Sequence, residues 1–149
     1  MIDLDEARCL EVLEAGSTAH IGVIDDGEPY VTPMSYVMLD GVFYFRTAPG
    51  RRDSALRASP RMCIEVSESD ADGWRSVVFW GNAEFVDDTN VRADVVAGLL
   101  HKYHSESALG FSSPGPLAEE RTVVAVTPEN LTGKASGGGL GGATRPGRL

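Results

Sequence analysis

Arginine and hydroxyl side chains gather in one short stretch of the sequence, residues 43–57 (FYFRTAPGRRDSALR). We expect a strand to end at Thr47, a Pro-Gly turn to follow, and Arg51 and Arg52 to begin a short helix. The free N–H groups and the dipole of a helix start attract phosphate, and guanidinium groups add forked donors that suit it. The stretch therefore predicts a phosphate site. The alternative is a solvated helix start whose arginines pair with Asp53 and other acids.

A proline interrupts the preceding apolar segment, residues 29–38 (PYVTPMSYVM). Alternation predicts one shared strand face for four of its residues: Thr32, Met34, Tyr36 and Met38. Pro33 withholds one N–H from the hydrogen-bond ladder, which predicts an edge strand or a bulge. The exposed backbone of an edge strand could bind the polar edge of a planar heterocycle, whereas the alternative is an ordinary barrel strand.

Large aromatic residues mark the longest expected strand, residues 74–86 (WRSVVFWGNAEFV). They are Trp74, Trp80 and Phe85, and Gly81 leaves a gap beside the second tryptophan. Such residues ordinarily belong to a core or a subunit interface. The alternative is a wall on which a flat ring stacks.

Motifs of hydrolytic enzymes are missing from the sequence, which contains neither GxSxG nor HExxH. His101 and His104 share one face of an expected helix, and an exposed helix face is favoured over a metal site because a third ligand is missing. Cys9 and Cys63 lie far apart and are expected to be buried thiols. The sequence therefore assigns no catalytic residue and no metal site.

The elements that must position these residues are mostly strands. The expected helices are 5–15, 51–59 and 88–104, and the expected strands are 18–24, 29–38, 42–47, 61–68, 74–86 and 121–127. About six hairpin-linked strands with few helices predict a mainly β fold, a small closed or partly closed barrel. Residues 105–118 are an expected loop. We expect one domain over 1–134 and a Gly-rich, flexible tail over 135–149.

Composition limits the class of protein. The chain has 149 residues, 42% hydrophobic and 23% charged, which is typical of one globular domain. No apolar run approaches the roughly 20 residues that span a bilayer, so no membrane association is expected. The net charge of −9 disfavours binding to nucleic acid. The acidic, amphipathic N-terminus differs from a secretory signal, and a cytoplasmic location is expected.

The order of several segments carries a resemblance to a known family. The segments are AGSTAHIGVI, GEPYVTPMSYVMLDGVFYFRTAPGRRDSALRASPRMCIEV, WRSVVFWGNAEFVDD, LLHKYH and VVAVTPENLTGK. Over roughly residues 5–134 the chain resembles the pyridoxamine 5′-phosphate oxidase-like, FMN-binding split-barrel proteins. Within them it is most similar to small flavin proteins related to nitroimidazole-resistance reductases. The resemblance implies a six-stranded antiparallel split β-barrel with peripheral helices, acting as a homodimer that binds FMN between its chains.

The resemblance also implies a set of cofactor-binding residues. They are Pro33, Met34, Ser35, Tyr36, Phe45, Arg46, Thr47, Arg51, Arg52, Ser76 and Trp80. Strand 33–36 would contact the isoalloxazine ring and the ribityl chain, and residues 45–47 would lie where the next strand meets the flavin and its phosphate. The arginines would neutralise the phosphate. Ser76 would lie near the ring, and Trp80 close to the subunit interface.

The implied activity is that of an FMN-dependent oxidoreductase, which transfers electrons or hydride to a small organic substrate. Three alternatives stay open: a deazaflavin-dependent reductase, a haem-binding protein, and a non-enzymatic flavin carrier. A structural protein with an empty barrel is a fourth. Relatives among the nitroimidazole reductases often carry histidine where Arg46 stands, and the C-terminal residues with which pyridoxamine phosphate oxidases recognise substrate have no counterpart here. The resemblance therefore leaves the substrate and the electron donor open.

Overall fold

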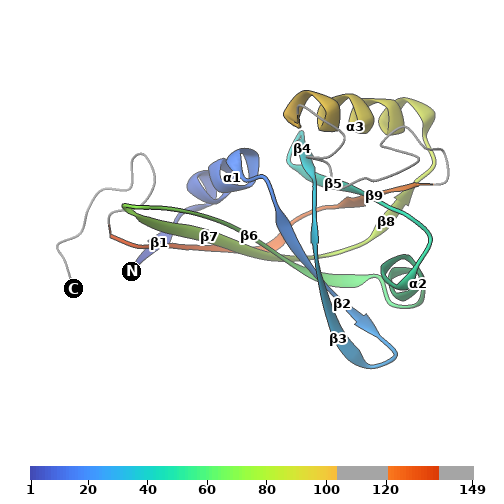
Figure 1. Cartoon of the computed structure of the whole chain (residues 1–149), viewed down its shortest axis with the longest axis horizontal. Helices are drawn as coiled ribbons and strands as arrows, with labels where there is room; N and C mark the ends of the chain where they lie inside the picture. The colour runs from blue at the N-terminus through green and yellow to red at the C-terminus, as the bar shows by residue number, and fades with distance from the viewer. Residues whose placement is uncertain (104–120, 138–149) are drawn as a thin grey trace.

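The computed structural model describes residues 1–103 and 121–137 (Figure 1). The helices in these ranges are α1 (Glu6–Ala15), α2 (Arg51–Ala58) and α3 (Thr89–Lys102). The strands are β1 (Ile2–Leu4), β2 (Ala19–Asp25), β3 (Glu28–Met34), β4 (Val37–Leu39), β5 (Val42–Thr47), β6 (Arg61–Asp70), β7 (Gly73–Asn82), β8 (Glu84–Val86), β9 (Thr122–Val126) and β10 (Glu129–Ala135). The expected loop over 105–118 lies outside the described residues, and so does most of the expected tail, 138–149.

The strands form two antiparallel sheets. One sheet has six strands in the order β1-β10-β7-β6-β2-β3, and the other has four in the order β4-β5-β9-β8. The chain passes from the first sheet to the second at Ser35–Tyr36, between β3 and β4, and again at Ala83, between β7 and β8. The predicted mainly β, antiparallel split barrel with peripheral helices is confirmed.

These two crossings explain where the expected strand limits differ from the structure. Segments 29–38 and 74–86 were each expected to be one strand, and each is two. Tyr36 and Met38 nevertheless pack into the same core as Met34, so the alternation of the sequence continues across the break. The strands β1 and β10 were not predicted. β10 is largely polar, and both strands depend on partners distant in sequence, since Ile2 pairs with Ala135.

The core lies between the inner faces of the two sheets and is rich in aromatic rings. Tyr36 stacks on Phe43 with ring centroids 4.7 Å apart, and Phe79 meets Phe43 edge-on at 5.5 Å. Both pairs lie in the range in which aromatic contacts stabilise beyond the area they bury. The rings thereby join β5, β7 and the β3–β4 link.

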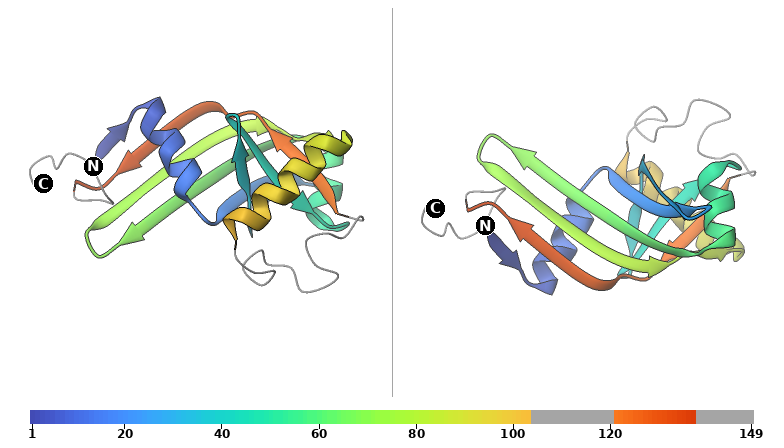
Figure 2. Two further views of the ribbon diagram at one scale, coloured as in Figure 1. Left: turned by 90° about the horizontal axis from the view of Figure 1, so that it is seen from above. Right: turned by 90° about the horizontal axis from the view of Figure 1, so that it is seen from below.

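Three helices cover the barrel. Asp5 caps α1, since its side chain accepts a hydrogen bond from the Arg8 N–H at 2.9 Å. Seen from above in Figure 2, α1 and α3 lie on the near side of the sheets. Seen from below, the β2–β3 hairpin and α2 lie on the near side. α3 packs Val95 and Leu99 against Val37 of the four-stranded sheet. None of the helices in the described part of the chain is long and apolar enough to cross a membrane.

Candidate functional site

The start of α2 and strand β3 meet through one arginine. Arg52 donates from Nε and Nη2 to the hydroxyl of Thr32, at 2.9 and 2.6 Å, and from Nη1 to the hydroxyl of Thr47 at 3.4 Å. Burial lowers the pKa of Arg52, but a guanidinium stays protonated at neutral pH. A fixed cation and two hydroxyl groups therefore lie together where β5 ends and α2 begins.

The N-terminus of α2 adds backbone donors to this group. Gly50 occupies the N-cap position, and no side chain caps the helix there. The first N–H groups of an α-helix lack acceptors within the helix, so those of Arg51, Arg52 and Asp53 are available to an anion. The two halves of the predicted phosphate site, the helix start and the guanidinium of Arg52, are thus brought together.

Arg51 lies at the same helix start, but its side chain turns toward the β2–β3 hairpin. Its Nε donates to Asp25 at 2.5 Å, and its guanidinium lies 4.3 Å from the centre of the Tyr30 ring. The Asp25 carboxylate neutralises part of its charge, as the alternative interpretation of the sequence expected for such arginines. Arg51 therefore contributes less to an anion site than Arg52.

Arg46 lies on the other face of β5. Its neighbour on that face is Tyr44, which packs against the cluster around α3. Arg46 is only 3% exposed, and burial together with the charges of Arg121 and Arg92 lowers its pKa to about 10. The structure thus separates Arg46 from Arg52, although the sequence placed both in one basic stretch.

The predicted edge position of Pro33 is confirmed. β3 is the last strand of the six-stranded sheet, and Pro33 is exposed on it opposite His20 of β2. The missing N–H of proline is tolerated at an edge, and the edge leaves other backbone N–H and C=O groups available to a ligand. Met34 and Ser35 continue this edge and are partly buried.

Tyr36 and Phe45 have structural positions in this chain. Neither side chain is exposed. Tyr36 donates from its hydroxyl to the Leu13 carbonyl at 2.7 Å and from its backbone N–H to the Tyr103 hydroxyl at 3.2 Å. A contact of either residue with the cofactor, which the resemblance implies for both, would therefore have to go through its backbone.

The end of α3 joins this region, which the sequence did not indicate. Lys102 donates from Nζ to the Tyr36 carbonyl at 3.0 Å, and the Tyr103 hydroxyl donates to the Ser17 carbonyl at 2.6 Å. The side chain of Ser35 also hydrogen-bonds to Tyr103. Helical spacing indicated only the packing role of Tyr103. Thr32 was placed on the correct face of β3 but was not counted in the site.

Ser76 and Trp80 lie on the outer face of the six-stranded sheet, away from Arg52. Trp80 is opposite Cys63, which is opposite Gly22, which is opposite Val31, so these four residues form one row across four strands. Val31 is 61% exposed and Trp80 37%. An apolar surface of this kind is typical of an interface.

Titratable groups elsewhere in the described residues give little support for acid–base or metal chemistry. His20 and Glu65 form a pair on the outer sheet face, with Nδ1 and Oε2 2.8 Å apart. No group of three or more metal-ligating side chains occurs within 1–103 and 121–137. His104 lies outside the described residues. Cys9 is a buried free thiol, as expected, whereas Cys63 is a free thiol that is only partly buried.

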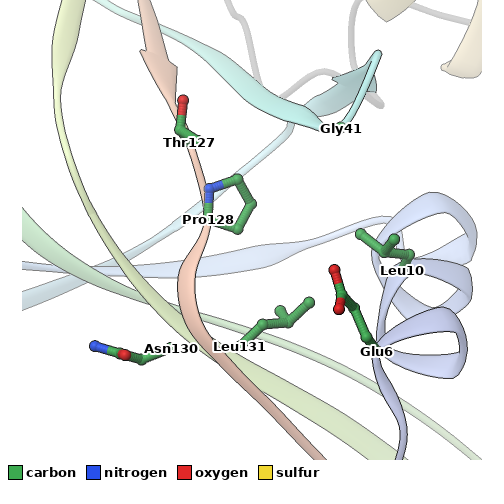
Figure 3. A pocket seen from close by; sticks show the side chains of 7 residues that line it. All are labelled: Glu6, Leu10, Gly41, Thr127, Pro128, Asn130 and Leu131. Carbon is green, nitrogen blue, oxygen red and sulfur yellow. The ribbon is translucent and has the colours of Figure 1, made fainter.

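A separate cleft lies between α1 and the link from β9 to β10. It has a volume of about 410 Å³, and Figure 3 shows Glu6 and Leu10 projecting from α1 toward Leu131 of β10. Its lining is completed by Gly41, Thr127, Pro128 and Asn130. None of the predicted cofactor residues lines this cleft, so it is distinct from the site at Arg52.

Known proteins share this fold and part of this sequence. An FAD-binding protein from Mesorhizobium loti superimposes with a TM-score of 0.78 and 28% identity, over 91% of this chain and 97% of that one. A candidate 5-nitroimidazole antibiotic resistance protein from Bacteroides thetaiotaomicron superimposes with a TM-score of 0.74 and 21% identity, over 90% and 86% of the two chains. The second likeness is one of fold.

A curated relative and a family model complete the comparison. An uncharacterized protein from Rhizobium meliloti is 27% identical over 79 residues, 52% of each chain, so the match spans about half the length of that relative. The family model described as pyridoxamine 5′-phosphate oxidase matches residues 5–135. Those residues include every strand of both sheets except β1, all three helices, and every predicted cofactor residue. The chain therefore belongs to the pyridoxamine 5′-phosphate oxidase family, as the order of its sequence segments indicated.

Proposed function

We propose that this protein binds FMN and acts as an oxidoreductase that transfers electrons or hydride to a small organic substrate. The observation that carries the proposal is the convergence of Arg52, Thr32 and Thr47 at the uncapped start of α2, beside the edge strand β3. This donor set suits a phosphate group. The similarity to the FAD-binding protein from Mesorhizobium loti supports the proposal that this phosphate belongs to a flavin nucleotide.

The phosphate would be held by Arg52 and by the first N–H groups of α2. The hydroxyls of Thr32 and Thr47 orient the guanidinium, and Thr47 is almost completely buried. A planar guanidinium and backbone donors together match the geometry of a phosphate better than a point charge does. Arg51 would add long-range attraction while it stays paired with Asp25.

The isoalloxazine ring would lie along β3, toward Met34 and Ser35. The edge backbone of this strand can donate to and accept from the polar rim of such a ring, as Pro33 indicated. FMN, when bound, supplies the electron or hydride transfer, and the chain supplies binding, orientation and electrostatics. No residue is assigned as acid or base.

A homodimer completes the proposal. The exposed row from Val31 to Trp80 crosses four strands of the six-stranded sheet, with Gly22 keeping its middle flat. A twofold axis would place the same apolar row of a second copy against it. Trp80 would then lie at the interface, in the position that the resemblance implies.

The test is the absorption spectrum of the purified protein, followed by equilibrium titration with FMN, FAD, a deazaflavin and haem. We expect bound oxidised flavin, with FMN the tightest ligand, and reduction of an organic acceptor when NAD(P)H is supplied. Tighter binding of the deazaflavin would favour the deazaflavin-dependent reductase. Flavin binding without turnover would favour a carrier, and binding of none of these ligands would contradict the proposal.

A further inference from the structure

Lys102 is a half-buried lysine at the last turn of α3, and no step of the proposed function uses it. Its Nζ donates to the Tyr36 carbonyl at 3.0 Å and lies 3.6 Å from the centre of the Tyr36 ring. The hydroxyl of Tyr103, the next residue, accepts a hydrogen bond from the Tyr36 N–H of the same link at 3.2 Å. The last residue of α3 and its C-cap residue therefore both hold the backbone of the β3–β4 link.

Burial destabilises the charged form of Lys102, and nearby carboxylates offset only part of this effect. Burial is the largest influence and lowers its pKa to about 8, while Glu14 of α1 and Glu68 of β6 act in the opposite direction. Glu68 is itself paired with Arg75, at 2.7 Å, so its charge is partly cancelled. Among the described residues, Tyr36 and Tyr103 are the other titratable groups beside the ammonium. A cation is thus kept in a partly desolvated position.

The position of this cation relative to the proposed phosphate site follows from β3. Thr32 of β3, which holds Arg52, and Ser35, which follows the end of β3 and contacts Tyr103, are three residues apart in the chain, a span of at most about 10 Å in extended backbone. A ligand anchored by its phosphate at Arg52 and extended along the edge of β3 therefore reaches the link that Lys102 holds. The proposed site thus has one cation at each end: Arg52 where the phosphate would bind, and Lys102 at the β3–β4 link.

We propose that Lys102 is a positioning residue of the flavin site, which fixes the Ser35–Tyr36 link through the Tyr36 carbonyl and raises the reduction potential of a flavin bound beside it. This inference rests on the proposed function. Reduction by an external donor adds electrons to the ring, and a nearby cation stabilises the added charge. When Lys102 loses its proton this stabilisation ends, so the potential depends on its protonation state.

The positioning role can be measured on the protein without flavin. Hydrogen exchange of the backbone amides of residues 34–37 is compared in wild type, Lys102→Met and Lys134→Met. The chain has only these two lysines, and Lys134 lies on β10, where it pairs with Asp3. We expect several-fold faster exchange in Lys102→Met alone. Equal exchange in wild type and Lys102→Met would overturn the positioning role.

The electrostatic role is measured on the FMN-loaded protein. The midpoint potential is recorded against pH by equilibration with dithionite and a reference dye. Isotope-labelled lysine gives only two side-chain signals, from which the titration of Lys102 is followed in the same samples. We expect the wild-type potential to fall more steeply above about pH 8, where Lys102 begins to lose its proton. We expect Lys102→Met to have a lower potential at neutral pH without this bend.

Lys102→Arg supplies the conservative control, because it keeps the cation at every accessible pH. Its potential is expected to stay near the wild-type value at neutral pH and to show no bend. Identical curves for wild type and Lys102→Met would overturn the electrostatic role, while flavin binding itself would still support the proposed function. If the wild-type protein takes up no flavin, the proposed function and the electrostatic role both fail, and the exchange data alone decide the positioning role.

Discussion

Arg52 and Thr32 belong to different elements, yet the guanidinium of one donates twice to the hydroxyl of the other, at 2.9 and 2.6 Å. This contact joins the start of α2 to the edge strand β3. The contact places a fixed positive charge beside β3. In the described chain, β3 and β1 are the two edge strands of the six-stranded sheet. The proposed cofactor site depends on this joint more than on any other contact.

Arg52→Ala is expected to weaken FMN binding about 10- to 100-fold, because a charge-assisted hydrogen bond contributes about 1.5–3 kcal/mol. Fluorescence titration with FMN measures the change. Arg57→Ala is the matched control on the same helix, since Arg57 pairs with Asp53 at 3.2 Å and lies over the Phe85 ring. Equal FMN affinities of Arg52→Ala and wild type would contradict the assignment of the phosphate to this site.

Gly16→Ala is expected to destabilise the fold by about 1–3 kcal/mol, the usual effect of overpacking. A Cβ at this position would lie 2.4 Å from Cγ1 of Val66 and 2.6 Å from the Tyr36 hydroxyl. Gly50→Ala is the control, since its Cβ would come no closer than 3.9 Å to another atom, the Ala48 carbonyl oxygen. Urea unfolding of both variants gives the comparison, and a similar loss in both would show that crowding is not the cause.

Tyr36→Phe removes the hydroxyl that donates to the Leu13 carbonyl at 2.7 Å while it keeps the ring stacked on Phe43. A buried acceptor left without its donor is expected to cost about 1–3 kcal/mol of unfolding free energy. Chemical denaturation measures the loss. Because the side chain lies in the core, FMN affinity of the folded variant is expected to change less than in Arg52→Ala. A larger loss of affinity would instead place this hydroxyl at the cofactor.

Lys102 is expected to make stability rise with pH on the alkaline side. Its pKa is about 8 in the folded chain and 10.5 in the absence of burial, so between these values the unfolded chain binds a proton that the folded chain does not. The free energy of unfolding of wild type, relative to Lys102→Met, should therefore increase from about pH 8 to about pH 10. Urea denaturation at several pH values tests this, and a constant difference would show that Lys102 is not desolvated.

Val31→Asp is expected to convert a homodimer into monomers, because it places a charge at the β3 end of the apolar row that forms the proposed interface. Sedimentation velocity measures the oligomeric state. Leu100→Asp is the control, as Leu100 is also an exposed apolar residue but lies on α3. Dissociation by Leu100→Asp and not by Val31→Asp would move the interface from the sheet to the helix.

Local chemistry made most elements predictable. The limits of the hairpin turns followed from Asp26-Gly27 and Asp40-Gly41, all four of which have positive φ. α3 begins at Thr89, one residue after the expected start, because the Asp88 side chain caps the helix by accepting from the Asn90 and Val91 N–H groups. β1 and β10 could not be foreseen, because their reason to be strands is their pairing with each other and, for β10, with β7.

The candidate site was foreseen in part. The grouping of Arg52 with the start of α2 could be predicted, because residue types near a helix start indicate where donors for an anion would gather. Sequence proximity did not show that Arg46 and Arg52 lie apart. Adjacent strand positions point to opposite faces, and the structure turns Arg46 toward α3. Lys102 was not identified, because its partner Tyr36 is 66 residues away and no spacing reveals that contact.

The pairing of β1 with β10 has a consequence for how the chain folds. Ile2 and Ala135 are cross-strand partners, so the first strand finds its place only after nearly the whole described chain exists. Contacts between such distant segments carry a large loop-closure entropy and slow folding. During synthesis, β1 and the edge of β7 that faces β10 therefore stay unpaired until β10 has emerged from the ribosome.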